Sequence, residues 1–500
     1  MLKKTVRNAG GELVRKDLNA IIQDGKADQK LVADFVRAAS EAIGPDNVST
    51  EQADLLSTCR DYWPPGNIWM LEGSVPALPQ VVVWPKSTTD VARALKLANE
   101  RKLPVTPFGE GSGALGGAIP LRGGVVVDLK KMNRVRSLEP VNLLVSVESG
   151  LNGARYEEAL NRSGFTGGHF PQSLRCSTVG GWLACRAAGQ FSTRYGKIED
   201  IVVSLEAVLP DGTVFSSRDV PRASTGPRPD LLFLGSEGTF GIITAATLRI
   251  WPLPEKRHLA SFTFAEMESA LEAIRLFMRY GCRPAVVRLY DAQETGNHFP
   301  GLGDKRCVLI LLVEGAGGIV EAESEIITRH ILDNGGIDTG PEHVEHWLEN
   351  RFNISVASIL FQKGAVLDTI EVTANWHNAY QTYSAMQEAL LGVEGTMLAS
   401  GHYSHMYPEG VALYITTVGF PGSDKIAYFK QLWKAAMEAC LKCGAAISHH
   451  HGVGLNRAPW MADEHGAALE VMRRIKGALD PNGIMNPGKL GFTEVEKWLK

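Results

Sequence analysis

Three consecutive histidines, His449, His450 and His451, stand directly before a Gly-Val-Gly triplet. The imidazole side chain exchanges a proton near neutral pH and is also a common metal ligand. The glycines predict a tight, exposed loop rather than a strand of the core. A single histidine is most often structural, but three in one loop favour acid–base catalysis or the orientation of a substrate.

Glycine is crowded into the stretch Pro104–Gly124, PVTPFGEGSGALGGAIPLRGG. Because glycine has no Cβ atom, the backbone amides of such a loop can converge on an anion, which predicts a diphosphate-binding site. Gly111, Gly113 and Gly116 also match the GxGxxG pattern of nicotinamide-binding folds, which requires a helix directly after the glycines. A proline and two further glycines leave no room for that helix before the predicted strand 125–129. The stretch therefore predicts a diphosphate cradle of another kind, or only a glycine-rich connection between strands.

Two more glycine-rich stretches follow in the same part of the chain. The first covers residues 165–200 and leads at Ser177–Gly181 into a predicted helix rich in alanine, whose small side chains permit the close approach of a flat ligand. The second is Gly235–Gly241, which precedes a strand-like segment. Three such loops in one domain predict one extended ligand contacted at several places, and three independent turns are the alternative.

The composition of the 500-residue chain is typical of globular proteins, with 44% hydrophobic and 21% charged residues. The net charge of −4 argues against a general nucleic-acid-binding surface, and no apolar run is long enough to span a bilayer. The N-terminus has basic residues but lacks the apolar core of a secretory signal. The seven cysteines favour a reducing compartment over a disulfide framework, and the single CxxC pair, Cys440 and Cys443, has no second pair with which to form a zinc site. We therefore expect a cytoplasmic protein, with peripheral membrane association left open.

The periodicity of apolar residues divides the chain into four parts. The first part is polar with apolar residues at helical spacing, so it is predicted to be helical and to act as a cap or as an oligomer arm, which leaves a homodimer open. Prolines and charges at 252–256 mark the clearest later boundary. The predicted parts are an N-terminal extension (1–44), a domain with all three glycine loops (45–257), an α+β domain (258–445) and a C-terminal segment (446–500).

Seven motifs in order along the chain resemble the vanillyl-alcohol oxidase family, also called the PCMH-type flavoproteins. Within that family the chain looks most like alkyldihydroxyacetonephosphate synthase and its bacterial FAD-linked oxidase relatives. The resemblance runs from about residue 45 to the C-terminus. The motifs are PFGEGSG (107–113), PQSLRCSTVGGW (171–182), YGKIEDIVV (195–203), STGPRPD (224–230), GSEGTFGIIT (235–244), VRLYD (287–291) and SHHHGVG (448–454).

The resemblance implies an α+β fold with a two-subdomain PCMH-type FAD-binding domain, an α+β substrate (cap) domain and a C-terminal segment that returns to the flavin. It also implies FAD as cofactor, with the diphosphate on the first glycine loop. Some family members attach the flavin through a histidine in that loop; this loop has none, so we expect a non-covalently held flavin. The implied cofactor-binding residues are Pro107, Gly109, Glu110, Gly111, Ser112, Gly113, Ser173, Ser177, Thr178, Arg186, Glu237, Gly238, Thr239, Gly241 and Ile243.

The resemblance also implies roles for residues outside the glycine loops. It puts His449, His450 and His451 on the substrate side of the flavin. Tyr414 matches a tyrosine with an acid–base role in the synthase, although a strand tyrosine taken alone most often packs in a core. Arg288 matches an arginine that the synthase requires, and it could clamp an anionic group of a substrate.

The chain departs from the synthase at two positions. Val356–Phe361, where the synthase has a phosphate-binding arginine, contains no cation, and His402 replaces another arginine. Both departures argue against a phosphorylated substrate, although Arg351, a few residues upstream, could substitute. His402 remains a candidate substrate-binding residue.

The segment GHYSH is also similar to the histidine-bearing strand of flavin-dependent 2-hydroxyacid dehydrogenases such as D-lactate dehydrogenase, some of which hold the hydroxyacid on a divalent metal. His402, His405 and His450 offer three imidazoles for such an ion. The glutamate that those relatives carry just before the last histidine is here His450. A metal is therefore the minority interpretation.

Three functions remain open. The leading hypothesis is an FAD-dependent oxidoreductase that removes hydride from an alcohol or 2-hydroxyacid, with Tyr414 or a histidine of the triplet taking the hydroxyl proton. The second is an alkylglycerone-phosphate synthase, in which FAD is a covalent trap while an acyl group is exchanged for an alkyl group. The third is a non-catalytic flavoprotein subunit. The first two use a small-molecule substrate, and none of the sequence features specifies an electron acceptor.

Overall fold

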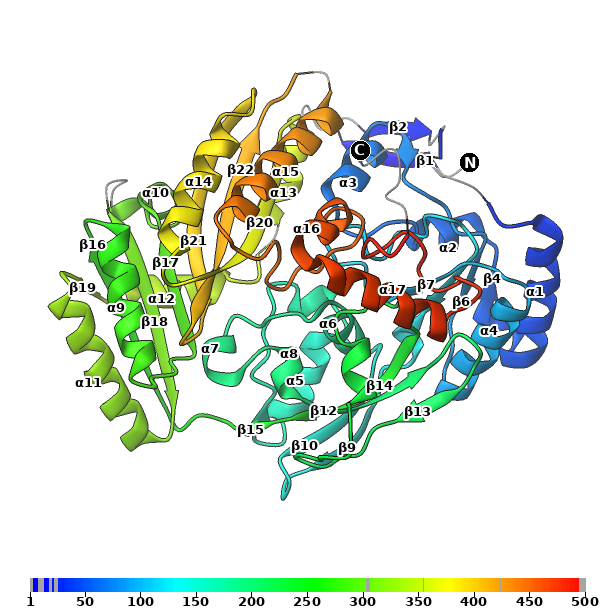
Figure 1. Cartoon of the computed structure of the whole chain (residues 1–500), viewed down its shortest axis with the longest axis horizontal. Helices are drawn as coiled ribbons and strands as arrows, with labels where there is room; N and C mark the ends of the chain where they lie inside the picture. The colour runs from blue at the N-terminus through cyan, green and yellow to red at the C-terminus, as the bar shows by residue number, and fades with distance from the viewer. Residues whose placement is uncertain are drawn as a thin grey trace.

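The computed structural model describes residues 3–7, 13–17, 20–21, 26–302, 306–353, 355–422 and 424–493. Within them the chain forms three units, two smaller sheets and a large one, joined by a C-terminal segment (Figure 1). None of the helices in these ranges is both long and apolar enough to cross a membrane.

The start of the chain differs from the helix predicted for residues 1–44. Strands β1 (Lys3–Arg7) and β2 (Leu13–Asp17) pair antiparallel, and β3 (Ala20–Ile21) pairs with β5 (Ser74–Val75). The two strand sequences have few apolar side chains to fix a helical face, so the pairing between the strands decides the structure there. The remaining residues before position 26 lie outside the described part, and the predicted helical character is found only in α1 (Gln29–Ile43).

The first unit is a four-stranded sheet in the order β4-β6-β8-β7. The valine-rich strands β6 and β8 are fully buried and pair in parallel, as continuous apolar runs do when both faces of a sheet are covered. Helix α4 follows β6, and Ser87 caps its first turn through the amide of Asp90. The elements of this unit are β4 (Val48–Ser49), α2 (Gln52–Ser57), α3 (Pro64–Leu71), β6 (Val81–Val83), α4 (Thr88–Glu100), β7 (Val105–Phe108) and β8 (Val125–Asp128).

The second unit is a five-stranded antiparallel sheet in the order β13-β12-β14-β10-β9. Asp211 and Gly212 form the turn of the hairpin between β12 and β13, with Gly212 at a positive φ of 88°. The elements of this unit are β9 (Val135–Glu139), β10 (Leu144–Glu148), α5 (Gly153–Asn161), β11 (Phe165–Thr166), α6 (Val179–Cys185), α7 (Ser192–Tyr195), α8 (Ile198–Ile201), β12 (Val202–Val208), β13 (Val214–Ser216), β14 (Ile242–Arg249) and β15 (Trp251–Pro252).

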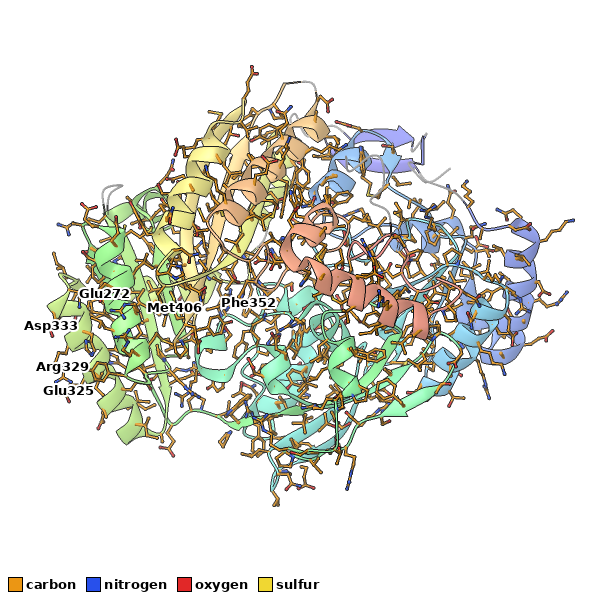
Figure 2. The ribbon with its side chains drawn as sticks, viewed as in Figure 1. Glu272, Glu325, Arg329, Asp333, Phe352 and Met406 are labelled. Atoms are coloured by element: carbon orange, nitrogen blue, oxygen red, sulfur yellow. The ribbon has the colours of Figure 1, made fainter. Side chains whose placement is uncertain are left out.

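The cap domain is a seven-stranded antiparallel sheet in the order β19-β16-β18-β17-β21-β22-β20. Helices α9, α11, α14 and α15 cover one face, and the opposite face turns toward the two smaller sheets (Figure 1). Glu325, Arg329 and Asp333 mark α11 at the outer edge of the cap (Figure 2). Its elements are β16 (Lys256–Phe264), α9 (Met267–Arg279), β17 (Val286–Tyr290), α10 (Ala292–His298), β18 (Cys307–Gly315), α11 (Gly317–Asp333), β19 (Ile337–Gly340), α12 (Glu342–Asn350), α13 (Ser355–Gln362), β20 (Val366–Asn375), α14 (Ala379–Leu391), β21 (Thr396–Met406), β22 (Gly410–Gly419) and α15 (Lys425–Lys442).

The last segment leaves the cap and returns to the first unit. It contains α16 (Met461–His465) and α17 (Ala467–Leu479) and lies between the cap and the smaller sheets (Figure 1). Beyond α17, the amide of Asn486 donates to the carbonyl of Val105 at 2.7 Å, so the chain end is tied to β7. Cys440 lies buried near the end of α15, and Cys443 caps that helix.

Candidate active site

The alternation of side chains along the cap strands sorts polar residues onto one face of the sheet. Leu289, Tyr403 and Leu413 belong to the apolar core under the helices, so Arg288, His402 and Tyr414, one position before or after them, point to the other face. His402 and Tyr414 are directly paired across β21 and β22, and their rings stack with centroids 4.6 Å apart. The sheet register therefore brings predicted residues from distant segments together.

His405 joins this face through an irregularity in β21. The pairing register shifts between Ser404 and Met406, and His405 has a positive φ of 53°. A bulge of this kind re-aims a side chain that regular alternation would send to the other face. The ring of His405 then lies between two hydroxyls, with Nε2 2.6 Å from Oη of Tyr414 and Nδ1 2.6 Å from Oγ of Ser192.

The loop of the histidine triplet is anchored by a buried ion pair. Glu371 of β20 and Arg457 have fully buried side chains whose nearest atoms are 3.1 Å apart. The carboxylate of Glu371 also accepts the amides of His449 and, at 2.8 Å, of His451. Lys197 donates to the carbonyl of His449 at 2.6 Å. These contacts fix the backbone, so the imidazole rings are held in place by residues on other elements.

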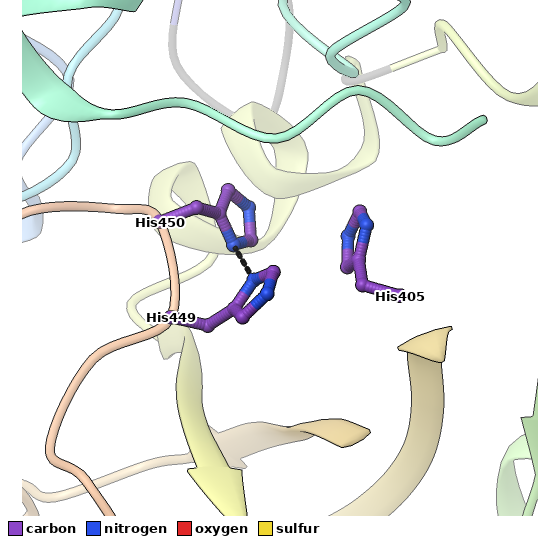
Figure 3. A group of neighbouring side chains, drawn as sticks. All are labelled: His405, His449 and His450. Atoms are coloured by element: carbon purple, nitrogen blue, oxygen red, sulfur yellow. Dashed lines mark hydrogen bonds between the residues drawn. The ribbon is translucent and has the colours of Figure 1, made fainter. Parts of the chain in front are cut away.

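The triplet meets the cap face at Tyr414. Nε2 of His450 is 3.4 Å from the Tyr414 hydroxyl, and Nδ1 of His450 is 3.0 Å from Nδ1 of His449. Nε2 of His449 lies 2.6 Å from the hydroxyl of Tyr407. Figure 3 shows the rings of His449 and His450 facing His405 across a short gap. His451 turns back toward Glu371, with Nδ1 3.7 Å from the carboxylate.

Burial sets the charge state of this cluster. It lowers the pKa of His405, His449 and His450 well below the usual value, and neighbouring cationic groups act in the same direction. Burial also raises the pKa of Tyr414 well above its usual value. At neutral pH the cluster therefore consists of neutral imidazoles around a protonated phenol.

The sequence offered His402, His405 and His450 as possible metal ligands, but the structure groups a different set of imidazoles. Among the described residues, His405, His449 and His450 each offer a nitrogen, and these atoms lie within 4.8 Å of one another. His402 is engaged elsewhere. A guanidinium can only donate, so Arg288 donates to Nε2 of His402 at 2.7 Å, and Nδ1–H of His402 donates to Glu294 at 2.9 Å. Burial lowers the pKa of His402, and the carboxylate does not restore it.

The three glycine-rich stretches converge below this cluster. A Cβ atom on Gly109 of the first would lie 2.5 Å from Oγ1 of Thr178 in the second. A Cβ atom on Gly238 of the third would lie 2.6 Å from the ring of Pro107 in the first. The loops therefore touch at positions where only glycine fits, which agrees with one shared site rather than three separate turns.

The first loop presents unused backbone donors. Its amides from Glu110 to Gly117 donate no hydrogen bond to another group within the described residues, although most of the loop is half-buried. Buried amides normally have partners, so a row of unpaired ones indicates an external acceptor. Convergent amides of this kind form an anion-binding concavity.

Glu237 connects the glycine loops to the histidine loop. Its buried carboxylate accepts the amides of Val453 at 2.6 Å and Gly454 at 2.8 Å, and it lies beside Gly117. Burial raises the pKa of Glu237 to about 7. Asn486 donates to the carbonyls of Glu237 and Gly117 at 2.7 and 2.9 Å, so the C-terminal segment closes the same junction.

Several residues predicted to line a cofactor have side chains committed elsewhere. Arg186 pairs with Glu199 at 3.0 Å, Ser177 accepts from the indole of Trp182 at 2.8 Å, and Ile243 packs in the core of the second unit. Glu110 accepts from Asn152, Thr178 caps α6, Ser173 precedes a short helical turn and Thr239 bonds to the carbonyl of Ser236. Ser112, Gly113 and Gly241 belong to the first and third loops. These residues could serve a ligand mainly through their backbone.

Comparison with known proteins identifies both halves of the chain. Residues 79–218 match the model of an FAD binding domain, and residues 253–490 match that of the C-terminal domain of FAD linked oxidases. An uncharacterised FAD-linked oxidoreductase, YgcU, of Escherichia coli (strain K12) is 32% identical over 481 residues, covering 92% of this chain and 98% of that protein.

Two further relatives carry different activities in their names. Alkyldihydroxyacetonephosphate synthase of Caenorhabditis elegans is 28% identical, covering 84% of this chain and 77% of its own length. A probable mitochondrial D-lactate dehydrogenase of Danio rerio is also 28% identical, covering 82% of this chain and 84% of its own length.

A solved structure of an alkyldihydroxyacetonephosphate synthase superposes with a TM-score of 0.80 at 24% identity, covering 93% of this chain and 87% of that one. This likeness confirms the predicted α+β fold, with an N-terminal FAD domain and a C-terminal cap.

Proposed function

Because the chain belongs to the FAD-linked oxidoreductase family, with FAD as its cofactor, we propose that it oxidises an alcohol or a 2-hydroxyacid. The observation that carries the proposal is the Tyr414–His405 pair, a phenol and a neutral imidazole 2.6 Å apart on the face of the cap that turns toward the glycine loops. Such a pair is suited to taking the proton of a hydroxyl group.

The residues of the glycine loops fit FAD. The diphosphate carries two negative charges, and the unpaired amides from Glu110 to Gly113 supply donors without a bulky side chain. The contacts at Gly109 and Gly238 leave the three loops close enough to hold one extended molecule. We propose that these backbone groups, with Ser112, hold the diphosphate, and that Glu237 braces the junction to the histidine loop.

When bound, FAD supplies the isoalloxazine ring that accepts a hydride equivalent. The residues of this chain manage the proton. The oxygen of Tyr414 accepts the proton of the substrate hydroxyl while its own proton moves to Nε2 of His405. With Nε2 of His405 accepting the hydroxyl of Tyr414, Nδ1–H of His405 donates to Oγ of Ser192. His450, 3.4 Å from Tyr414, orients the hydroxyl group.

Arg288 supplies the positive charge of the site. Its guanidinium is tied to His402 and to the hydroxyl of Tyr290 at 2.9 Å, which fixes its plane. A fixed guanidinium suits the carboxylate of a 2-hydroxyacid, because it donates two parallel hydrogen bonds. The D-lactate dehydrogenase relative agrees with this substrate class.

The test is anaerobic mixing of the purified yellow protein with single D- and L-2-hydroxyacids and with primary and secondary alcohols. Loss of the flavin absorbance near 450 nm, a general property of reduced flavins, supports the proposal. A flavin that stays oxidised with every compound in such a screen contradicts it.

The synthase relative supports a second candidate, alkylglycerone-phosphate synthesis. The same protein is incubated with acyl-dihydroxyacetone phosphate and a fatty alcohol, and alkyl product is measured by mass spectrometry. Exchange without flavin bleaching favours this candidate. Absence of both activities favours a non-catalytic flavoprotein subunit. Loss of activity on chelation, with recovery on adding a divalent metal, favours an ion at His405, His449 and His450.

A further inference from the structure

Arg351, at the C-terminal end of α12, is enclosed by aromatic rings from both halves of the molecule. The two halves meet here, since two of the rings belong to loops of the FAD-binding half and two to the cap. The distances from the guanidinium carbon to the ring centres are 5.1 Å for Phe170, 4.7 Å for Phe191, 5.7 Å for Trp347 and 4.6 Å for Phe352.

The guanidinium has no anionic partner in the described part of the chain. Its Nε and Nη1 atoms are shielded from solvent and without a hydrogen bond acceptor, and no carboxylate of the described residues lies within ion-pair distance. Gln190 nearby has a buried, unpaired Oε1, while its Nε2 donates to the Arg351 carbonyl at 3.4 Å. A buried charge without a counter-ion is costly, so proteins rarely keep one without a use.

Arg457 shows how this chain treats a buried structural arginine. Its guanidinium also lies over an aromatic ring, that of Trp433 at 5.1 Å. In contrast to Arg351, it pairs with Glu371 and donates to the carbonyls of Gly452 at 2.8 Å and Glu371 at 2.6 Å. Arg457 therefore has an anionic partner despite a buried, unpaired Nε, whereas Arg351 has no anionic partner among the described residues.

The Arg351 cage adjoins the candidate active site. Trp347 contacts Arg351 and also Arg288, whose guanidinium carbon is 5.5 Å from the ring centre. Phe191 immediately precedes Ser192, the hydroxyl partner of His405. Two residues after Phe191, Oγ1 of Thr193 accepts the amide of Met406 at 3.0 Å, and Met406 ends β21, the strand of His402 and His405.

We propose that Arg351 is an anion subsite that binds a second acidic group of the substrate, a carboxylate or a phosphate, away from the carbon that is oxidised. The inference rests on the proposed function and narrows it to substrates with an acidic group at the far end. A planar guanidinium held by flanking rings suits a carboxylate or a phosphate, because these anions accept two parallel hydrogen bonds from it.

The charge of the subsite fits this use. Burial lowers the pKa of Arg351 to about 10, and Arg257 acts in the same direction, while Glu314 and Glu157 oppose it. Arg351 is therefore cationic at neutral pH, and a bound anion would relieve the cost of its burial. Glu314 is already engaged by Arg257 at 2.8 Å and by the hydroxyl of Tyr195 at 2.7 Å.

The test measures binding of compounds that cannot be oxidised to the FAD-loaded protein. Butyrate has one acidic group, succinate adds a terminal carboxylate, and 3-phosphonopropionate adds a terminal phosphonate. Affinities are measured by calorimetry and by the difference spectrum of the flavin. We expect wild type to bind at least one diacid about tenfold or more tightly than butyrate, as for a charge-assisted hydrogen bond. Which diacid is preferred distinguishes a dicarboxylate from a phosphate-bearing substrate.

Three variants identify the residue responsible. Arg351→Met should abolish the preference for the diacid, and Arg351→Lys should retain part of it. Arg249→Met is the matched control, because Arg249 also stacks on an aromatic ring, that of Trp251 at 4.8 Å, but lies outside the site. It should bind all three compounds as wild type does. FAD content and melting temperature show that each variant is folded.

Two outcomes overturn the subsite: wild type that does not distinguish butyrate from either diacid, or an unchanged preference in Arg351→Met. The proposed function fails separately. If binding of a diacid over butyrate depends on Arg351 but no hydroxyacid or alcohol bleaches the flavin, the subsite is supported and the oxidase activity is refuted. If an alcohol bleaches the flavin but no diacid is preferred over butyrate, the oxidase activity is supported and the subsite is refuted.

Discussion

The proton-handling side chains of the candidate active site are uncharged because they are buried together. Three imidazoles held below their usual pKa cannot store a proton at neutral pH, but a neutral imidazole can accept one for the duration of a reaction. Tyr414 is the residue that His405 and His450 share. Its hydroxyl is thus the point at which the proton of a substrate would enter the cluster.

Replacing Tyr414 by Phe removes this hydroxyl and nothing else. We expect the rate of flavin reduction by a substrate to fall by about 10²–10⁴-fold, the range for a lost acid–base group. FAD content should be unchanged, because the hydroxyl lies on the cap. Stopped-flow measurement of flavin bleaching checks this.

Tyr403→Phe is the matched control for Tyr414→Phe. Tyr403 is the neighbouring strand tyrosine on the helical face, where its buried hydroxyl donates to the carbonyl of Ala379 at 3.0 Å. Its loss should cost stability, about 1 kcal/mol for a buried hydrogen bond, without slowing reduction in the folded protein. Equal rates in Tyr414→Phe and wild type would remove the phenol from the mechanism.

Glu237 gives a pH dependence of stability with a defined sign. Its pKa is raised by burial from 4.5 to about 7, so the folded protein holds this proton more tightly than the unfolded chain. The contribution of Glu237 is therefore most favourable in acid and is lost as the pH rises from 4.5 through 7, by about 3 kcal/mol in total. Glu237→Gln carries no charge and should not show this loss.

The measurement is the free energy of urea unfolding of the FAD-free proteins at pH 5.5 and pH 8. Relative to wild type, Glu237→Gln should have a higher free energy of unfolding at pH 8 than at pH 5.5. Asp61, whose pKa burial raises to about 6, titrates in both proteins, and its charge is one of the causes that raise the pKa of Glu237. A difference that is the same at both pH values would show that Glu237 has an ordinary pKa.

Single residues were predictable from the sequence where a local motif marked them. The triplet, Tyr414 and Arg288 were identified as candidates, and the structure brings them together. From the sequence, His405 is a candidate only as a metal ligand. Regular alternation along β21 would send its side chain to the face covered by helices, and the bulge that redirects it cannot be predicted from one strand. Glu371 has no local signal, since its partners lie more than 70 residues away.

At the scale of elements, the first glycine loop carries the sharpest prediction. Gly111 has a positive φ of 65°, and a Cβ atom there would lie 2.8 Å from the ring of Phe108. Gly111→Asp therefore forces the loop or the ring of Phe108 to move, and it adds a negative charge to the loop proposed to bind the diphosphate. We expect the variant to purify without FAD, as measured by the ratio of flavin to protein absorbance.

A control variant distinguishes the effect of backbone strain at a positive φ from an effect on the proposed diphosphate site. Gly281 has a positive φ of 86°, a Cβ atom added there would meet nothing within 4 Å, and the residue is far from the loop in sequence. Gly281→Asp suffers the same strain but should keep its flavin. Normal FAD occupancy in a folded Gly111→Asp protein would mean that the diphosphate binds elsewhere.

Elements with strong periodicity were predictable, and the N-terminal strands were not. In α9 and α11 the buried apolar residues recur at helical spacing, which makes such helices predictable from the sequence. Residues 3–17 have few apolar side chains, so a helix and a hairpin have similar patterns there, and pairing between two strands decides between them.

At the scale of the whole molecule, the site exists only where all parts of the chain meet. The glycine loops come from the two smaller sheets, the polar face from the cap, and the histidines from the segment that returns after α15. The order of these parts could be predicted from motifs, whereas their contacts depend on long-range pairs such as Asn486 with Gly117. The domain boundaries remain predictions.

The side chains around the glycine loops also determine whether the flavin can be covalently attached. A covalent bond requires a nucleophilic side chain at the isoalloxazine, and the first loop, residues 107–117, contains no histidine, cysteine or tyrosine. Cys176 and Cys185 lie in the second stretch, but burial raises the pKa of both thiols, which leaves them protonated and unreactive. His169 is 1% exposed and therefore out of reach of a ligand.

We expect trichloroacetic acid to precipitate a colourless protein and to leave all of the FAD in the supernatant, as measured by absorbance and fluorescence. A washed pellet that stays yellow, or a protein band that fluoresces on a denaturing gel, would show a covalent link that these side chains do not predict.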